Sequence, residues 1–139
     1  MKPMAWNLLV GAWLIALCAT LGALFIGEVM GQAPCELCWY QRIAMFPLAW
    51  ILGIAAFRGR LDYDWYALPL TAVGVVMAAF HTLIYFDIIP EAIHQCGAGP
   101  SCSDTNAMQL FETVPIPLLS FLSFAAILIL LLAVRRTNR

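Results

Sequence analysis

The sequence predicts an all-α membrane protein, a bundle of four transmembrane helices with both termini in the cytoplasm. Of the 139 residues, 63% are hydrophobic and only 11% are charged, and the mean hydropathy is +0.88. The uncharged residues gather in four long runs. Nearly all basic residues flank these runs at the ends that would lie on one side of the membrane. A water-soluble domain of this length has too little interior to hide so much apolar surface, so we expect lipid as the solvent.

The four uncharged runs can be compared with the roughly 20 helical residues that cross a hydrocarbon core of ~30 Å. The run 3–27 has 25 residues, which is too long for the core of a signal peptide, and 65–86 and 113–134 have 22 each. The second run, 43–57, has 15 residues and becomes long enough only if it includes Arg42 near its outer end. The sequence therefore predicts one membrane domain over 1–139, with spans at about 4–27, 38–57, 65–87 and 113–134 and outer loops at 28–37 and 88–112.

The positions of the basic residues give the bundle a direction. With four spans, six of the seven basic residues share one side: Lys2, Arg58, Arg60, Arg135, Arg136 and Arg139. The positive-inside rule assigns that side to the cytoplasm. The two outer loops contain no Lys or Arg and are expected on the opposite face. The basic residues form no continuous stripe, so nucleic acid is not an expected partner, whereas membrane lipid is.

The second outer loop is predicted to contain a short helix lying flat in the interface. Ser103 or Asp104 would cap this helix. Its apolar side would carry Ala107, Met108, Leu110 and Phe111.

Four of the five cysteines fall on the outer side, as two pairs. Cys35 and Cys38 lie at the start of the second span, and Cys96 and Cys102 lie in the second outer loop. The outer side is the oxidising compartment, where thiols pair. Four cysteines allow three connectivities, of which pairing within each loop is the simplest. Cys18 lies inside the first span and is expected to be a small buried hydrophobic residue.

The segment 35–38, Cys-Glu-Leu-Cys, is a C-x-x-C motif at a predicted helix start, directly after Pro34. A helix N-terminus stabilises a thiolate, which is the form that attacks and leaves in disulfide exchange. Two alternatives are a pair of structural disulfides and a zinc site made by all four outer cysteines. A C-x-x-C closes too short a loop to be a strong staple, and the five-residue spacer between Cys96 and Cys102 makes a poor zinc knuckle. The motif therefore favours redox chemistry without a metal.

Two ionisable residues lie just below the C-x-x-C. Arg42 is four residues after Cys38, hence on the same helix face. Its side chain either extends to the outer headgroups or stabilises negative charge on Cys38 or on a reduced acceptor. His81 is at a similar depth in the third span, where it is either a functional group or a hydrogen-bond partner of a neighbouring helix. The sequence has no C-x-x-C-H haem motif and no G-x-G-x-x-G motif, so a lipid-soluble acceptor, a quinone, is expected.

The stretch 34–42, Pro-Cys-Glu-Leu-Cys-Trp-Tyr-Gln-Arg, followed by an apolar helix, closely resembles the DsbB family of quinone-dependent disulfide-forming membrane enzymes. Within that family the chain is most similar to the compact members called BdbC, and the resemblance extends over essentially the whole chain. It implies that Cys35 and Cys38 form the quinone-coupled pair, with Cys38 facing the quinone. Arg42, and less closely His81, match residues that bind the quinone.

The same resemblance implies roles for the loop pair and the surroundings. Cys96 would form a mixed disulfide with a thioredoxin-fold oxidase of the DsbA (BdbD) type, and Cys102 would pass electrons to Cys35. The acceptor would be menaquinone or ubiquinone, and the protein would span the bacterial cytoplasmic membrane with its active cysteines outside. Two alternatives stay open: a reductase similar to vitamin K epoxide reductases, and a membrane scaffold stapled by disulfides. A second C-x-x-C, which would favour the reductase, is absent from the sequence.

Overall fold

The computed structural model describes residues 1–60, 62–90, 101–103, 109–110 and 113–139. This part of the chain is almost entirely helical, and it contains four helices that are long and apolar enough to cross a membrane. The elements in order are α1 (Pro3–Leu24), η1 (Phe25–Val29), α2 (Glu36–Arg58), α3 (Asp64–Tyr85), β1 (Gln109–Leu110), β2 (Val114–Pro115) and α4 (Ile116–Asn138). The prediction of an all-helical protein with four potential membrane spans is confirmed.

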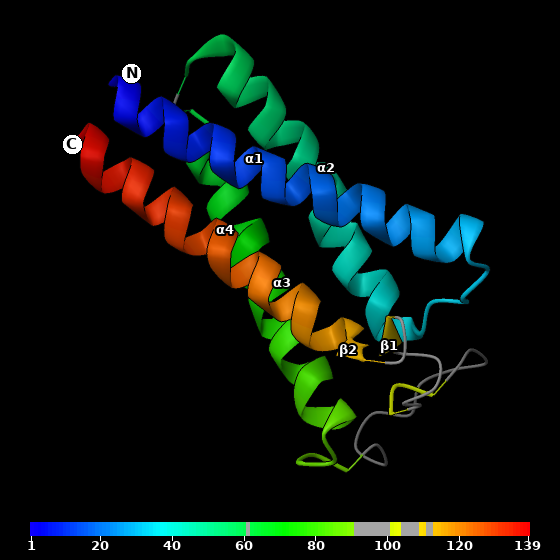
Figure 1. Cartoon of the computed structure of the whole chain (residues 1–139). Coiled ribbons are helices and arrows are strands. Elements are labelled where there is room, and N and C mark those ends of the chain that lie inside the picture. The colour runs from blue at the N-terminus through cyan, green and yellow to red at the C-terminus, as the bar shows by residue number, and fades with distance from the viewer. Residues whose placement is uncertain (61, 91–100, 104–108, 111–112) are drawn as a thin grey trace.

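The four helices form a ring in which each packs against two neighbours, in the order α1, α2, α3, α4 and back to α1 (Figure 1). Both termini lie at one end of the bundle, where the backbone N–H of Lys2 donates to Oδ1 of Asn138 at 3.3 Å. The start of α2 and the β1–β2 pair lie at the opposite end. The ring therefore brings the cysteine-bearing ends of separate segments together, far from the termini.

The helix ends follow from their local sequences. Prolines occupy the first turns of α1 and α4, where the missing backbone N–H has no helical partner to lose. Helix α2 ends at Gly59, whose φ of 61° is the left-handed conformation that glycine adopts easily. Helix α1 continues as a wider π-helical turn, η1, a distortion that occurs often at functional sites.

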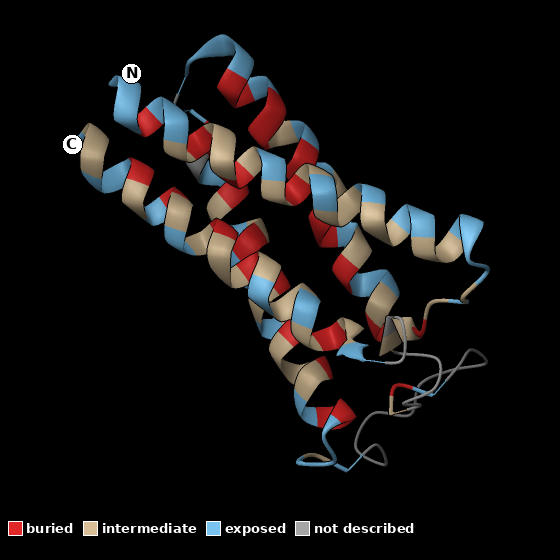
Figure 2. Cartoon of the chain, in the orientation of Figure 1, coloured by how far each residue is buried: buried red, intermediate tan, exposed pale blue. Residues whose placement is uncertain are grey.

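The bundle has a buried apolar interior, and its surface, unlike that of a water-soluble protein, is also rich in large apolar side chains; Figure 2 shows buried and exposed residues along the helices. Small and medium apolar side chains at every third or fourth position of α1 face inward: Ala5, Leu9, Ala12 and Ala16. Many large side chains face outward, with Trp50 76%, Phe57 81% and Trp65 85% exposed. So many exposed large apolar groups suit hydrocarbon as the surroundings, because lipid does not penalise their exposure. The fold is that of a multi-pass membrane protein.

Two glycines let the helices approach closely. A Cβ on Gly53 would come within 2.8 Å of Nε1 of Trp13, and a Cβ on Gly74 would collide with the ring of Phe124. Phe124 is fully buried, so a shift of its ring would disturb the neighbours packed around it. Small residues at such contacts allow the van der Waals packing that holds membrane helices together.

The segment between α3 and α4 differs from the predicted short helix. Gln109 pairs with Pro115 and Leu110 with Val114 as two short antiparallel strands. The side-chain amide of Gln109 also donates to the hydroxyl of Tyr85 at 3.0 Å. The helix prediction is therefore wrong at residues 109 and 110, because pairing with the residues before α4 satisfies their backbone groups. The remainder of that prediction falls on 104–108 and 111–112, which lie outside the described residues.

The Gly74–Phe124 contact gives a testable expectation for stability. Gly74→Ala should lower the thermal unfolding midpoint in detergent, because the added methyl overpacks a rigid contact at a cost of about 1–3 kcal/mol. Gly11→Ala is the matched control, since its Cβ would meet only Leu130 Cδ1 at an ordinary 3.9 Å. An equal midpoint for both variants would contradict the packing described here.

Candidate functional site

The site begins at the start of α2, where Cys35 is the N-cap residue. Its backbone is extended (φ −73°, ψ 172°), and its Sγ accepts a hydrogen bond from the backbone N–H of Cys38 at 3.3 Å. The sulfur thus occupies the position of the usual serine or threonine hydroxyl and satisfies one of the N–H groups that a helix start leaves unpaired. The C-x-x-C spacing therefore places both cysteines on the first turn of a rigid helix.

The two cysteines of this motif are chemically unequal. Both are free thiols, their sulfur atoms lie 3.0 Å apart, and the S–H of Cys35 donates to Sγ of Cys38. Cys35 is fully buried and Cys38 is half-buried. The hydrogen bond to Cys38, and then burial, raise the pKa of the Cys35 thiol above its ordinary value. This arrangement favours the proton on Cys35 and any negative charge of the pair on Cys38.

Arg42 lies one helical turn beyond Cys38 and points into the bundle. Its Nη2 donates to the backbone carbonyl of Ala23 on α1 at 2.9 Å, and its Cζ lies 5.4 Å from the centre of the Trp39 ring. Gly27 makes room for this arrangement, because a Cβ there would be 3.0 Å from Nη2. The guanidinium is half-buried and close enough to favour negative charge on Cys38. The structure thus shows Arg42 bonded to α1, one helical turn from the thiol, and its role towards an acceptor stays a prediction.

A cavity of about 220 Å³ opens beside this pair of residues. Its walls come from α1, η1, the 32–34 segment, α2 and α4, and are mostly apolar. The polar side chains on the walls include Gln32, Cys38, Gln41, Arg42 and Ser120. Among the described residues, the buried Oε1 of Gln32 has no hydrogen-bond partner. An apolar cavity with a few placed polar groups is the usual form of a small-molecule site.

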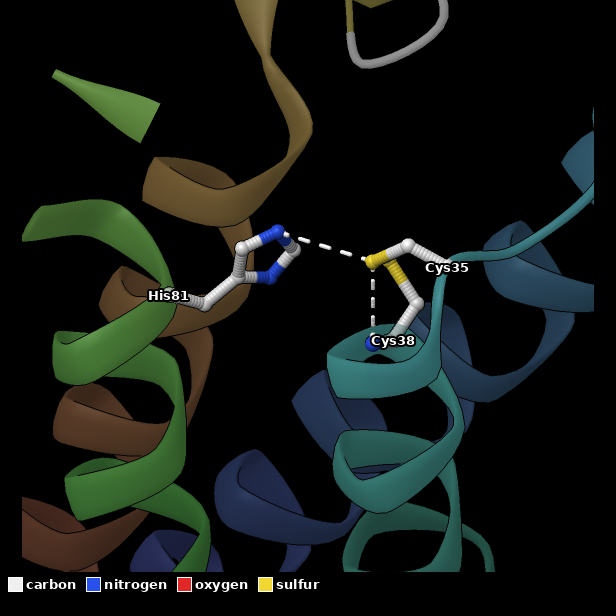
Figure 3. A group of neighbouring side chains, drawn as sticks. All are labelled: Cys35, Cys38 and His81. Carbon is white, nitrogen blue, oxygen red and sulfur yellow. Dashed lines mark hydrogen bonds between the residues drawn. The ribbon is translucent and has the colours of Figure 1, made fainter. Parts of the chain in front are cut away.

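His81 is fully buried on α3, and its ring points at Cys35 (Figure 3). Its Nε2 lies 3.7 Å from Sγ of Cys35, and its Nδ1 lies 2.8 Å from Nε2 of Gln41. Oε1 of Gln41 in turn accepts a hydrogen bond from the hydroxyl of Ser120 at 2.6 Å. His81 is not among the residues that line the cavity. The histidine predicted to bind the acceptor thus contacts the thiol pair, and its cofactor-binding role stays a prediction.

The second cysteine pair is described only at Cys102, because Cys96 lies outside the described residues. Cys102 is disulfide-bonded and fully buried. It belongs to a small apolar cluster with Cys35, Leu37, Ile84 and Tyr85. The backbone of Cys102 also hydrogen-bonds to the His81 ring. The structure therefore brings one cysteine of the loop pair close to the buried cysteine of the C-x-x-C.

The structure bears on two further expectations about the cysteines, the burial of Cys18 and the absence of a metal site. Cys18 is exposed rather than buried and lines the cavity, since the buried positions of α1 are taken by the alanines and leucine named above. The ligand atoms of Cys35, Cys38 and His81 lie within 4.8 Å of one another and could hold a metal. Structural zinc takes four ligands, however, and the disulfide removes the sulfur of Cys102 from any such set.

Sequence reasoning missed three members of the site: Gln32, Gln41 and Ser120. A signal was present for Gln41, because an amide inside an apolar span is costly unless it has a partner in the bundle. No comparable signal marks Ser120, since serine is ordinary in membrane helices. Gln32 lies in a loop, where a polar residue is unremarkable.

Comparisons with known proteins agree with a site for thiol chemistry. The family model described as disulfide bond formation protein DsbB matches residues 5–134. The chain is 55% identical over 134 residues to the probable disulfide formation protein of Metapseudomonas resinovorans, covering 96% of this chain and 92% of that relative. It is 39% identical over 121 residues to disulfide bond formation protein C of Bacillus subtilis, covering 87% of each. No solved structure shows a significant match to the chain.

These matches extend over nearly the whole chain and therefore include the C-x-x-C, the four apolar helices and the segment that carries Cys102. The local geometry is what such chemistry requires: two sulfurs at bonding reach on a helix start, with a third cysteine nearby. The chain belongs to the DsbB family of disulfide bond formation proteins and is a multi-pass membrane thiol–disulfide oxidoreductase.

Proposed function

We propose that this protein takes two electrons from a reduced thioredoxin-fold oxidase of the DsbA (BdbD) type and passes them to a membrane quinone, which supports disulfide formation in exported proteins. The observation that carries the proposal is the position of Cys38. Its sulfur lies 3.0 Å from that of Cys35, and the residue lines the apolar cavity together with Arg42. An acceptor that enters this cavity from lipid would meet the sulfur that bears the negative charge.

The polar groups of the cavity fit a quinone. Arg42 offers a cationic donor to a carbonyl oxygen, and the unpartnered Oε1 of Gln32 can accept from a hydroxyl of the reduced ring. The cavity, at about 220 Å³, is below the roughly 300–1,000 Å³ of typical drug-sized pockets and suits a single ring. A bound menaquinone or ubiquinone would supply a lipid-soluble acceptor of two electrons and two protons.

The two thiols of the C-x-x-C would have different roles in electron transfer. Cys38 faces the cavity beside Arg42 and is the sulfur from which electrons leave. Cys35 is buried beside Cys102 and is the sulfur at which electrons arrive from the loop pair. We call Cys35 and Cys38 the inner pair, and Cys96 and Cys102 the loop pair. Oxidation of the inner pair forms the Cys35–Cys38 bond and releases two electrons and the S–H proton of Cys35. By its resemblance to the family, Cys96 would exchange with the soluble partner.

Charge supports the direction of the protein in the membrane. The end of the bundle that carries both termini also carries six of the seven basic residues, so we infer that it faces the cytoplasm. The cysteines then face the outer side of the bacterial cytoplasmic membrane, where disulfides persist.

The unequal thiols can be tested by alkylation of the reduced, quinone-free protein. Iodoacetamide should modify Cys38 well before Cys35 at pH 8, because the raised pKa of Cys35 keeps it protonated. In Cys38→Ala the hydrogen bond that is the main cause of this shift is lost, so Cys35 should react several-fold faster than in the unmodified chain. Peptide mass spectrometry after acid quenching gives both rates. A Cys35 rate unaffected by Cys38→Ala would contradict this division.

Electron transfer to quinone can be followed directly. Protein purified in detergent should reduce a short-chain ubiquinone or menaquinone analogue, seen as a loss of quinone absorbance, when a reduced thioredoxin-fold oxidase is added. Cys35→Ser and Cys38→Ser should each abolish the signal, because no inner disulfide can form. If the absorbance does not change with either analogue, or if Cys35→Ser matches the unmodified protein, the quinone assignment is wrong.

A role of Arg42 in quinone binding can be distinguished from a role that only anchors α2 to α1. Arg42→Gln should raise the quinone KM by about 10-fold or more, because a charge-assisted hydrogen bond is worth about 1.5–3 kcal/mol. Arg58→Gln, which removes an exposed charge at the opposite end of α2, is the control and should leave the KM unchanged. An unchanged KM in Arg42→Gln would mean that the guanidinium only anchors α2 to α1.

A further inference from the structure

A connected chain of polar groups crosses three helices below the cysteines. Gln41 on α2 and His81 on α3 are buried, and Ser120 on α4 is half-buried. The Ser120 hydroxyl lies 2.6 Å from Oε1 of Gln41, and Nε2 of Gln41 lies 2.8 Å from Nδ1 of His81. The other ring nitrogen of His81 lies 3.7 Å from Sγ of Cys35. The chain thus runs from a residue on the cavity wall to the buried thiol.

The direction of each hydrogen bond in this chain follows from what the groups can donate. An amide oxygen only accepts and an amide nitrogen only donates. Because Ser120 donates to Oε1 of Gln41, the amide nitrogen of Gln41 faces His81 and donates to Nδ1. A neutral imidazole that accepts at Nδ1 carries its proton on Nε2. That N–H faces the sulfur of Cys35 and is also within reach of the backbone carbonyl of Cys102, which accepts a hydrogen bond from the ring.

The surroundings of the ring connect it with disulfide exchange. Cys35 and Gln41 face it from α2, and the backbone of Cys102 hydrogen-bonds to it from the segment after α3. The ring therefore lies between the buried cysteine of the inner pair and a cysteine of the loop pair. It is not among the residues that line the acceptor cavity.

We propose that His81 is a catalytic residue for exchange between Cys102 and Cys35, and that Gln41 and Ser120 are positioning residues that hold its proton on Nε2. This inference rests on the proposed transfer from the loop pair to the inner pair. It assigns His81 to the thiols rather than to the quinone. It also distinguishes Gln41, which orients His81, from its neighbour in sequence Arg42, which is proposed to bind the quinone.

The exchange step balances in two parts. The Cys102 thiolate attacks Cys35, the Cys35–Cys38 bond breaks, and Cys38 leaves as a thiolate beside Arg42. Cys96 then attacks Cys102, the Cys102–Cys35 bond breaks, and Cys35 takes up the proton that Cys96 loses. During this second departure the Nε2–H of His81 stabilises the sulfur of Cys35 by a hydrogen bond. Two electrons move to the inner pair, and His81 ends the step neutral.

The position of the proton can be read by NMR of protein labelled with ¹⁵N-histidine. The chain has two histidines, so His94→Gln leaves a single ring signal, that of His81. We expect the Nε2–H tautomer in this background and loss of that preference when Gln41→Met is added. A ring protonated on Nδ1, or a tautomer that does not respond to Gln41→Met, would overturn the proposal.

The catalytic consequence can be measured without any quinone. A reduced thioredoxin-fold oxidase is mixed with oxidised, quinone-free protein, and acid quenching with alkylation follows thiols as they appear first in the loop pair and then at Cys35 and Cys38. Gln41→Met and the milder Ser120→Ala should slow the second stage by roughly 10-fold, as expected for loss of one oriented hydrogen bond. Thr82→Val is the matched control: it removes a hydrogen bond to Ala78 within α3, next to His81, and should leave this rate unchanged.

A companion experiment measures the reduction of quinone separately from the exchange between the two cysteine pairs. In a Cys96→Ser/Cys102→Ser background, dithiothreitol reduces the inner pair directly, and Gln41→Met should slow quinone reduction by a smaller factor than it slows exchange, because the proposed defect precedes this step, although Gln41 also lines the cavity. The opposite result, a raised quinone KM with an unchanged exchange rate, would place Gln41 in acceptor binding and overturn the proposal. Because exchange is measured without quinone, failure of the quinone assignment would not be mistaken for failure of this one.

Discussion

The hydrogen bond between Gln41 and His81 is the interaction on which the geometry of the site depends. Both side chains are buried in an apolar bundle, where a polar group without a partner costs about 1–3 kcal/mol. Gln41 can satisfy its oxygen and its nitrogen together only when Ser120 and His81 are both in place. The pairing therefore sets the depth of three helices relative to one another, and the position of Cys35 against the His81 ring follows from it.

The start of α2 turns this positioning into two different thiols. Because Cys35 is the N-cap, its sulfur is directed back towards the first turn of the helix, where it meets both the N–H and the sulfur of Cys38. One sulfur is thereby buried and protonated, and the other faces a cavity beside a guanidinium. The helix end and the burial of Cys35 together make the two thiols of this four-residue motif different.

Helix α1 takes no part in the chain of Ser120, Gln41 and His81, yet it forms one wall of the cavity. Two features let it do so: the absence of a side chain at Gly27, which admits the guanidinium of Arg42, and the carbonyl of Ala23, which receives it. Both lie where the helix passes into the wider π-helical turn. In lipid, where helices are not driven together by the hydrophobic effect, such contacts carry a large share of the association.

The sequence by itself determined the four spans, the common end of the basic residues and the two cysteine pairs with a C-x-x-C at a helix start, because hydropathy, charge and helix capping are local properties. Counting rise per residue also put His81 near the level of Arg42. Only the tertiary structure decided what each side chain touches: His81 contacts Cys35 and Gln41 rather than the cavity, Cys18 is exposed and lines the cavity, and residues 109 and 110 form a strand. Depth along a helix follows from residue number, but rotation about the helix axis is set by packing against helices distant in the sequence, which local patterns do not encode.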